Sequence, residues 1–64
     1  MKQEYIATIY TGKGYYYVGP DADSTGIKEL VMADRKADTT FEVAYLYKFN
    51  PETAMPEGDP LWAV

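Results

Sequence analysis

The chain has 64 residues, and ten acidic residues against six basic ones give it a net charge of −4. It contains no cysteine and no histidine, which excludes stabilisation by disulfides or by a structural zinc ion. Sixty-four residues make one small domain that buries only about 60% of the surface of its unfolded chain. Because 47% of the residues are hydrophobic, we expect residues 1–64 to fold as a single compact domain rather than to be disordered.

The start of the chain, MKQEYIATIY, has no continuous apolar segment and no small-residue cleavage site, so it does not resemble a signal peptide. No apolar run approaches the roughly 20 residues that cross a bilayer. The lack of cysteine is compatible with a reducing compartment. We therefore expect a cytoplasmic monomer that does not bind membranes.

The first two elements are predicted to form a β-hairpin. Residues 3–11 and 15–19 are rich in β-forming residues, and Gly12-Lys13-Gly14 lies between them. A two-residue turn would place Ile9 on one face with Tyr16 and Val18, and Tyr10 on the other face with Tyr15 and Tyr17. A three-residue loop would reverse the faces of the second strand. In either register the three consecutive tyrosines are divided between the two faces.

A turn cluster, PDADSTG, separates this hairpin from a segment with helical periodicity, IKELVMADRKAD. The spacing predicts a helix near residues 26–37, with Ser24 or Thr25 as its N-cap. Its apolar positions share one face: Ile27, Leu30, Val31 and Ala37. A β-strand is the alternative for this segment, since Gly26 falls within the first helical turn.

Residues 39–49, TTFEVAYLYKF, alternate with a period of two and predict a strand that Asn50-Pro51 ends. Its more apolar face carries the side chains that we expect to be buried: Phe41, Val43, Tyr45, Tyr47 and Phe49. With Leu30 and Val31 of the helix, Phe41, Val43 and Tyr45 form the predicted core.

Residues 51–64 contain Pro51, Pro56, Pro60 and Gly58, which predicts an irregular, extended tail outside a core formed by residues 1–50. Leu61 and Trp62 are expected to hold this tail against the sheet. The fold predicted for the whole chain is α+β: a three-stranded antiparallel sheet with the order β-β-α-β and one helix packed on one face.

Catalytic and metal-binding groups are few. No nucleophile is paired with a base in the pattern, so we expect no enzymatic activity and no cofactor. The sequence DADSTG places Asp21, Asp23 and Thr25 at the first, third and fifth positions of an EF-hand calcium loop, but Met32 stands where the loop needs its bidentate glutamate. We interpret it as a turn that caps the helix, with no metal site.

Charge and aromatic residues are the features that indicate a binding function. Acidic residues gather at two places in the sequence, and ten aromatic residues exceed what one face of three short strands can bury. The candidate partner-binding residues are therefore Asp21, Asp23, Glu52, Glu57 and Asp59, together with Tyr15 and Tyr17. Alternatively, Trp62 and the tail fold over the second face and cover these tyrosines.

In its size, its acidity and its lack of histidine and cysteine, the chain resembles small phage-encoded inhibitors of the anti-CRISPR and anti-restriction type that imitate DNA. The resemblance implies that the carboxylates of the candidate residues stand in for phosphates. It also implies a protein partner with a basic nucleic-acid-binding surface, such as a CRISPR effector complex in a bacterial cytoplasm, whose DNA binding the chain blocks.

Two other functions fit the sequence. Exposed tyrosines could stack single-stranded bases in a small nucleic-acid-binding module, although only six basic residues accompany them. A structural or assembly subunit is the third possibility. Because acidic residues repel phosphate, we expect no direct binding to nucleic acid.

Overall fold

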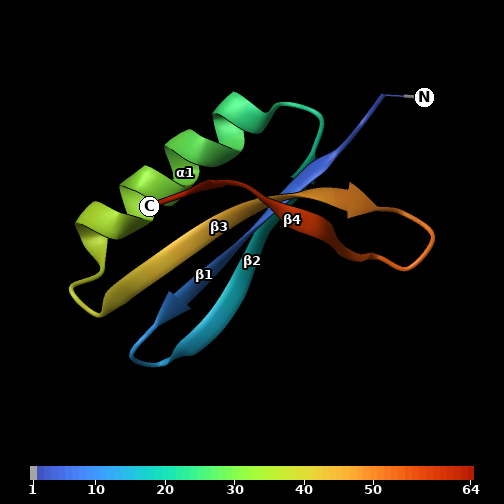
Figure 1. Ribbon diagram of the computed structural model, residues 1–64. Coiled ribbons are helices and arrows are strands. Elements are labelled where there is room, and N and C mark those ends of the chain that lie inside the picture. The colour runs from blue at the N-terminus through green and yellow to red at the C-terminus, as the bar shows by residue number, and fades with distance from the viewer. Residues whose placement is uncertain (1) are drawn as a thin grey trace.

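The computed structural model describes residues 2–64, which form one antiparallel sheet and one helix (Figure 1). The strands are β1 (Tyr5–Thr11), β2 (Gly14–Asp21), β3 (Phe41–Asn50) and β4 (Met55–Ala63), and the helix is α1 (Ser24–Ala37). The strand order is β2-β1-β3-β4, so the central pair, β1 and β3, joins two hairpins. The helix lies across one face of this sheet and leaves the other face uncovered (Figure 1).

The first hairpin has a two-residue turn at Gly12-Lys13, one of the registers that the sequence left open. Thr11 pairs with Gly14, Tyr10 with Tyr15 and Ile9 with Tyr16. Residues directly opposite each other in an antiparallel pair share a face, so Tyr10 and Tyr15 lie on one face and Ile9 and Tyr16 on the other. The predicted hairpin is confirmed, and the three tyrosines are divided between the two faces.

The predicted three-stranded sheet is wrong, because the segment expected to be an irregular tail supplies a fourth strand. Asn50 pairs with Met55 and Lys48 with Glu57, and a long bulge follows before Leu46 pairs with Trp62. Gly58, at φ +76°, lies in this bulge. The prolines are tolerated because β4 is an edge strand, where a missing backbone N–H need not leave a carbonyl of the sheet unpaired.

The helix forms where the periodicity predicts it, but it begins two residues earlier. Its N-cap is Asp23, not Ser24 or Thr25: the Asp23 side chain accepts a hydrogen bond from the Gly26 backbone N–H at 3.1 Å. Asp21 Oδ1 accepts in turn from the Asp23 N–H at 2.9 Å. The segment DADSTG is therefore the turn and cap that start α1.

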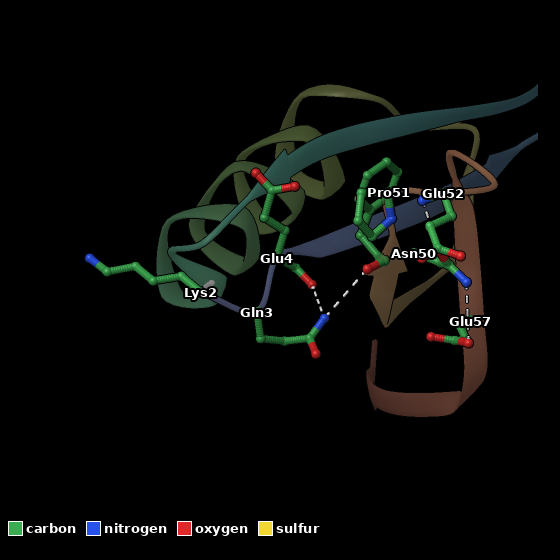
Figure 2. A pocket seen from close by; sticks show the side chains of 8 residues that line it. Lys2, Gln3, Glu4, Asn50, Pro51, Glu52 and Glu57 are labelled. Carbon is green, nitrogen blue, oxygen red and sulfur yellow. Dashed lines mark hydrogen bonds between the residues drawn. The ribbon is translucent and has the colours of Figure 1, made fainter.

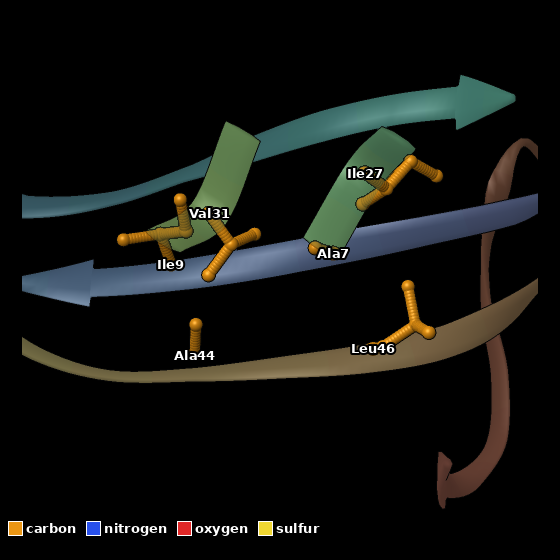
Figure 3. Close-up of a cluster of buried hydrophobic side chains, with 6 residues drawn as sticks. All are labelled: Ala7, Ile9, Ile27, Val31, Ala44 and Leu46. Carbon is orange, nitrogen blue, oxygen red and sulfur yellow. The ribbon is translucent and has the colours of Figure 1, made fainter. Parts of the chain in front are cut away.

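The core lies between α1 and the covered face of the sheet (Figure 3). Ile27 and Val31 project from the helix onto small and branched side chains of the two central strands. The buried core residues are Ala7, Ile9, Ile27, Val31, Ala44 and Leu46. Tyr5, Val18, Phe41, Trp62 and Val64 pack around this group and are partly buried.

Two predictions about the core are wrong. Leu30 is 58% exposed, because it lies on the flank of α1 and not on the face that meets the sheet. In β3, the buried side chains are Ala44 and Leu46. Val43 and Tyr45, which belong to the face predicted to be buried, are only partly buried. Small residues at the centre of the covered face let a helix pack closely, whereas a row of aromatic rings would hold it away.

The only helix in residues 2–64 has 14 residues, too short to cross a membrane.

Candidate binding surface

The uncovered face of the sheet carries five of the seven tyrosines. Thr8 pairs with Tyr17 on one side and with Tyr45 on the other, and Tyr10 pairs with Tyr15 and with Val43, so all these side chains share one face. We call this surface the tyrosine face; its members are Ile6, Thr8, Tyr10, Tyr15, Tyr17, Val43, Tyr45, Tyr47 and Ala63. None of them is charged.

The tyrosine rings form a continuous row across three strands. The centroids of Tyr17 and Tyr15 are 5.8 Å apart on β2, and Tyr15 is 5.9 Å from Tyr10 on β1. Tyr10 is 6.2 Å from Tyr45 on β3, which is 6.3 Å from Tyr47. The contacts are tilted or edge-to-face, the arrangements that aromatic pairs prefer.

The rings partly shield the strands beneath them but remain accessible themselves. Ile6 and Thr8 are each only 4% exposed, although no helix covers them. Tyr15 and Tyr17 are 62% and 45% exposed. Burial raises the pKa of the Tyr47 hydroxyl at the other end of the row. The face therefore offers aromatic surface to a partner while its interior is already packed.

Trp62 and β4 do not cover this face. Trp62 pairs with Leu46 and thus lies on the helix side of the sheet, where the Lys28 ammonium sits 5.6 Å from its ring centroid. Ala63 of β4 pairs with Tyr45 of β3, so β4 lies beside β3 in the sheet and not over the tyrosine face. The alternative in which the tail buries the tyrosines is therefore wrong for residues 2–64.

The two acidic places in the sequence come together at one end of the sheet. Tyr5 pairs with Asp21 of β2 and with Lys48 of β3, and Lys48 pairs with Glu57 of β4. Six carboxylates and two lysines lie in this part of the molecule: Glu4, Asp21, Asp23, Glu52, Glu57 and Asp59, with Lys2 and Lys48. Six negative and two positive charges give this region a charge of −4, which equals the net charge of the whole chain because the other four acidic and four basic residues balance. We call this region the acidic end.

An open hollow of about 380 Å³ lies in the acidic end, between the start of β1 and the β3–β4 turn (Figure 2). Gln3 Nε2 donates to the carbonyl oxygens of Glu4 and Phe49, and Asn50 Nδ2 donates to Glu57 Oε1 at 3.3 Å. Its carboxylates come from Glu4, Glu52 and Glu57. Within residues 2–64, no group of three or more carboxylates is arranged to hold a metal ion.

The structure thus places every sequence-predicted site residue in one of two regions. Tyr15 and Tyr17 lie on the tyrosine face, and the five acidic candidates lie at the acidic end. Asp21 and Asp23 also serve the helix cap, so their oxygens are partly used within the chain. Tyr10 was expected on the face of Tyr15 and Tyr17 but was not among the candidate binding residues. Tyr45 and Tyr47, expected to be buried against the helix, lie on the opposite face and are partly buried there.

Tyr16 lies on the opposite, helix-covered side and links β2 to α1. Its hydroxyl donates to Asp34 Oδ2 at 2.7 Å. This hydrogen bond, supported by burial and by the negative charges of Asp34 and Asp38, raises the pKa of Tyr16 to about 12. The neutral phenol is the form that the folded chain stabilises.

We therefore expect Tyr16 to make folding sensitive to alkaline pH. A raised pKa in the folded state means that the stabilisation is complete below the ordinary tyrosine pKa of 10.0 and is lost as the pH rises towards about 12. Urea unfolding of the wild type and of Tyr16→Phe at a series of pH values would measure this loss of stability. The free energy of unfolding should fall less steeply in Tyr16→Phe, whereas the control Tyr15→Phe should follow the wild type. Equal slopes for all three chains would contradict this role.

No protein-family model, curated protein sequence or solved structure matches the chain.

Proposed function

We propose that the chain is a small binding protein that docks on another protein through its tyrosine face, with the acidic end turned towards basic residues of that partner. The supporting observation is the row of five tyrosine rings, three of them exposed, on an uncharged sheet face that ends beside the acidic end. Aromatic residues are enriched at the centre of protein interfaces, and a polar rim commonly surrounds them.

The nature of the partner follows from the charge. A surface with excess carboxylates is attracted to lysine- and arginine-rich surfaces, and the largest of these serve nucleic-acid binding. We propose that the chain occupies the nucleic-acid-binding surface of a bacterial defence complex, as a phage-type inhibitor does, and so prevents that complex from binding DNA. In this mechanism the carboxylates of Glu52, Glu57 and Asp59 take the places of phosphates.

The competing function is stacking of single-stranded bases on the tyrosine face. The row of rings on a four-stranded sheet favours it, because base–aromatic stacking contributes about 1–3 kcal/mol per base. The charge opposes it: no lysine or arginine belongs to the tyrosine face, and Lys48, which directly follows Tyr47 in sequence, lies on the helix side, where it pairs with Tyr5. Backbone phosphates would therefore gain little attraction.

A gel-shift experiment separates the two functions. We expect no retardation of labelled single- or double-stranded DNA by the purified chain at moderate salt. Retardation of single-stranded DNA that Tyr15→Ser abolishes would contradict the proposal and favour base stacking.

A displacement experiment then tests the inhibitor. Bacterial proteins retained on the immobilised chain should be released by added DNA, because both compete for one basic surface. The double variant Glu52→Lys/Glu57→Lys should retain much less protein, as should Tyr15→Ser/Tyr17→Ser, whereas Glu29→Lys on the exposed side of α1 should retain the wild-type amount. Association should also slow as salt rises, since the long-range attraction is screened beyond roughly 8–10 Å. Retention that neither DNA nor the acidic-end variant reduces would disprove phosphate mimicry.

A further inference from the structure

The outer edge of β2 is unprotected from Gly14 to Val18, and its chemistry fits a second copy of the same strand. Thr11 and Gly14 close a two-residue hairpin as a hydrogen-bonded pair, so Ile9–Tyr16 and Ala7–Val18 are the next such pairs along the ladder. The backbone N–H and C=O groups of Tyr15 and Tyr17 therefore point away from β1, towards the open edge. Strand β2 is the last strand on this side of the sheet, so no strand within residues 2–64 pairs with them.

The two edges of the sheet differ in their protection. Natural edge strands avoid pairing with other chains by means of prolines, charges and bulges. Strand β4 has two prolines, Pro56 and Pro60, with a bulge between them that contains Gly58. Strand β2 has a proline, a charged residue and a register shift only after Val18, and from Gly14 to Val18 it has none of these. The β2 edge is thus the one that remains able to accept a strand.

The side chains beside this edge are mainly aromatic or aliphatic, with the Asp34 carboxylate hydrogen-bonded to Tyr16 on the helix side. Tyr15 and Tyr17 flank it on the tyrosine face, and Tyr16 flanks it on the helix side at 39% exposure. Leu30, 58% exposed, lies one helical turn before Asp34, the residue that accepts the Tyr16 hydrogen bond, so it occupies the flank of α1 that faces β2. An isolated monomer leaves all of these surfaces in water.

We infer that two copies of the chain pair antiparallel through β2, with a two-fold axis at Tyr16, to form a continuous eight-stranded sheet. In this register Tyr16 faces its own counterpart, and Tyr15 of each copy faces Tyr17 of the other. Opposite residues share a face, so the tyrosine faces of both copies join into one surface and both helices lie on the other side. Aromatic cross-strand pairs of this kind stabilise antiparallel sheets.

Charge supports the antiparallel orientation. The Lys13 turn and the acidic end lie at opposite ends of β2. In this register Lys13 faces Gly19 of the other copy, two residues before Asp21, so an antiparallel pair brings the two opposite charges near each other. Within one copy, a strand of eight residues keeps Lys13 and Asp21 roughly 25 Å apart. A parallel pairing would instead place the two acidic ends side by side. The inference replaces the monomer expected from the sequence.

Sedimentation of the purified full chain from low micromolar to millimolar concentration tests the pairing. We expect a monomer–dimer equilibrium whose dissociation constant rises by at least about tenfold in Tyr17→Pro. Proline removes an outward N–H without removing a hydrogen bond to β1, and prolines are found at such edge positions. Tyr17→Ala keeps the N–H and is the matched control; it should dimerise more tightly than Tyr17→Pro. Circular dichroism verifies that each variant is folded.

Charge exchange and cross-linking test the register. Lys13→Glu and Asp21→Lys should each weaken the dimer, and the double variant should recover it, since these residues can meet only between copies. Tyr16→Cys should form a disulfide-linked dimer on oxidation, because opposite Cα atoms in a non-hydrogen-bonded pair lie about 4.5 Å apart. The control Thr53→Cys, in the β3–β4 turn, should not.

A chain that stays monomeric at every concentration would overturn the inference, as would a dimer unaffected by Tyr17→Pro. Retention of a partner on the tyrosine face is measured separately and uses different substitutions. The failure of one proposal therefore leaves the other standing.

Discussion

Replacing Leu46 with alanine is expected to lower the free energy of unfolding by about 2–5 kcal/mol. Leu46 is 2% exposed and lies on the central strand β3, where it packs in the core cluster against α1 (Figure 3). Alanine would remove its branched side chain and leave a cavity that the surrounding strands cannot close. Because a domain of this size has a small margin of stability, the variant is expected to be largely unfolded at room temperature.

Leu61→Ala is the matched control for this prediction. It removes the same atoms from the same residue type, but Leu61 is 52% exposed on the edge strand β4. Chemical denaturation followed by circular dichroism should show a change within about 0.5 kcal/mol for Leu61→Ala. Similar losses for the two variants would mean that the core does not lie between α1 and the covered face.

The second large effect is expected at Gly19, near the end of β2. Its φ of +106° is a conformation that residues with a side chain rarely adopt, and a Cβ atom there would lie 3.0 Å from the Tyr5 carbonyl oxygen and 3.4 Å from Ile27 Cδ1. Backbone strain and overpacking together should make Gly19→Ala less stable by roughly 2–6 kcal/mol.

Gly58→Ala separates these two contributions. Gly58 also has a positive φ, +76°, but a Cβ atom there would meet no other atom within 4 Å. It should therefore lose only about 1–2 kcal/mol, from the backbone alone. Thermal unfolding of both variants at one protein concentration gives the comparison. Equal melting temperatures would show that contact with Tyr5 and Ile27 adds little to the destabilisation at Gly19.

Local sequence patterns predicted the elements whose signals are local. The Gly12-Lys13-Gly14 segment located the first hairpin, and helical spacing located α1 with its buried residues Ile27 and Val31, although it wrongly added Leu30. These predictions depend on neighbours within a few residues, which is the range over which turn chemistry and periodicity act.

The features that the sequence did not predict depend on contacts between distant residues. The sequence of β3 is compatible with packing either of its faces against the helix. The face that packs is the one with Ala44, because Ala44 and Ala7, which lie 37 positions apart, together leave space for α1. Strand β4 was missed because its prolines are acceptable only at an edge, and the sequence does not state which strands are edges. The acidic end, likewise, exists only because the strand order brings Asp21 and Glu57 to the same end of the sheet.

The strand order also predicts which step of folding is slow. Both outer pairings, β1 with β2 and β3 with β4, are hairpins closed by short turns, and such hairpins form within about 1–10 µs. The central pairing of β1 with β3 joins residues as far apart as Tyr5 and Lys48, so it carries most of the entropy cost of closing the chain. The slow event in folding is thus expected to be the meeting of two preformed hairpins beneath α1. Substitutions along the β1–β3 seam would then slow folding, whereas substitutions in the outer strands would mainly hasten unfolding.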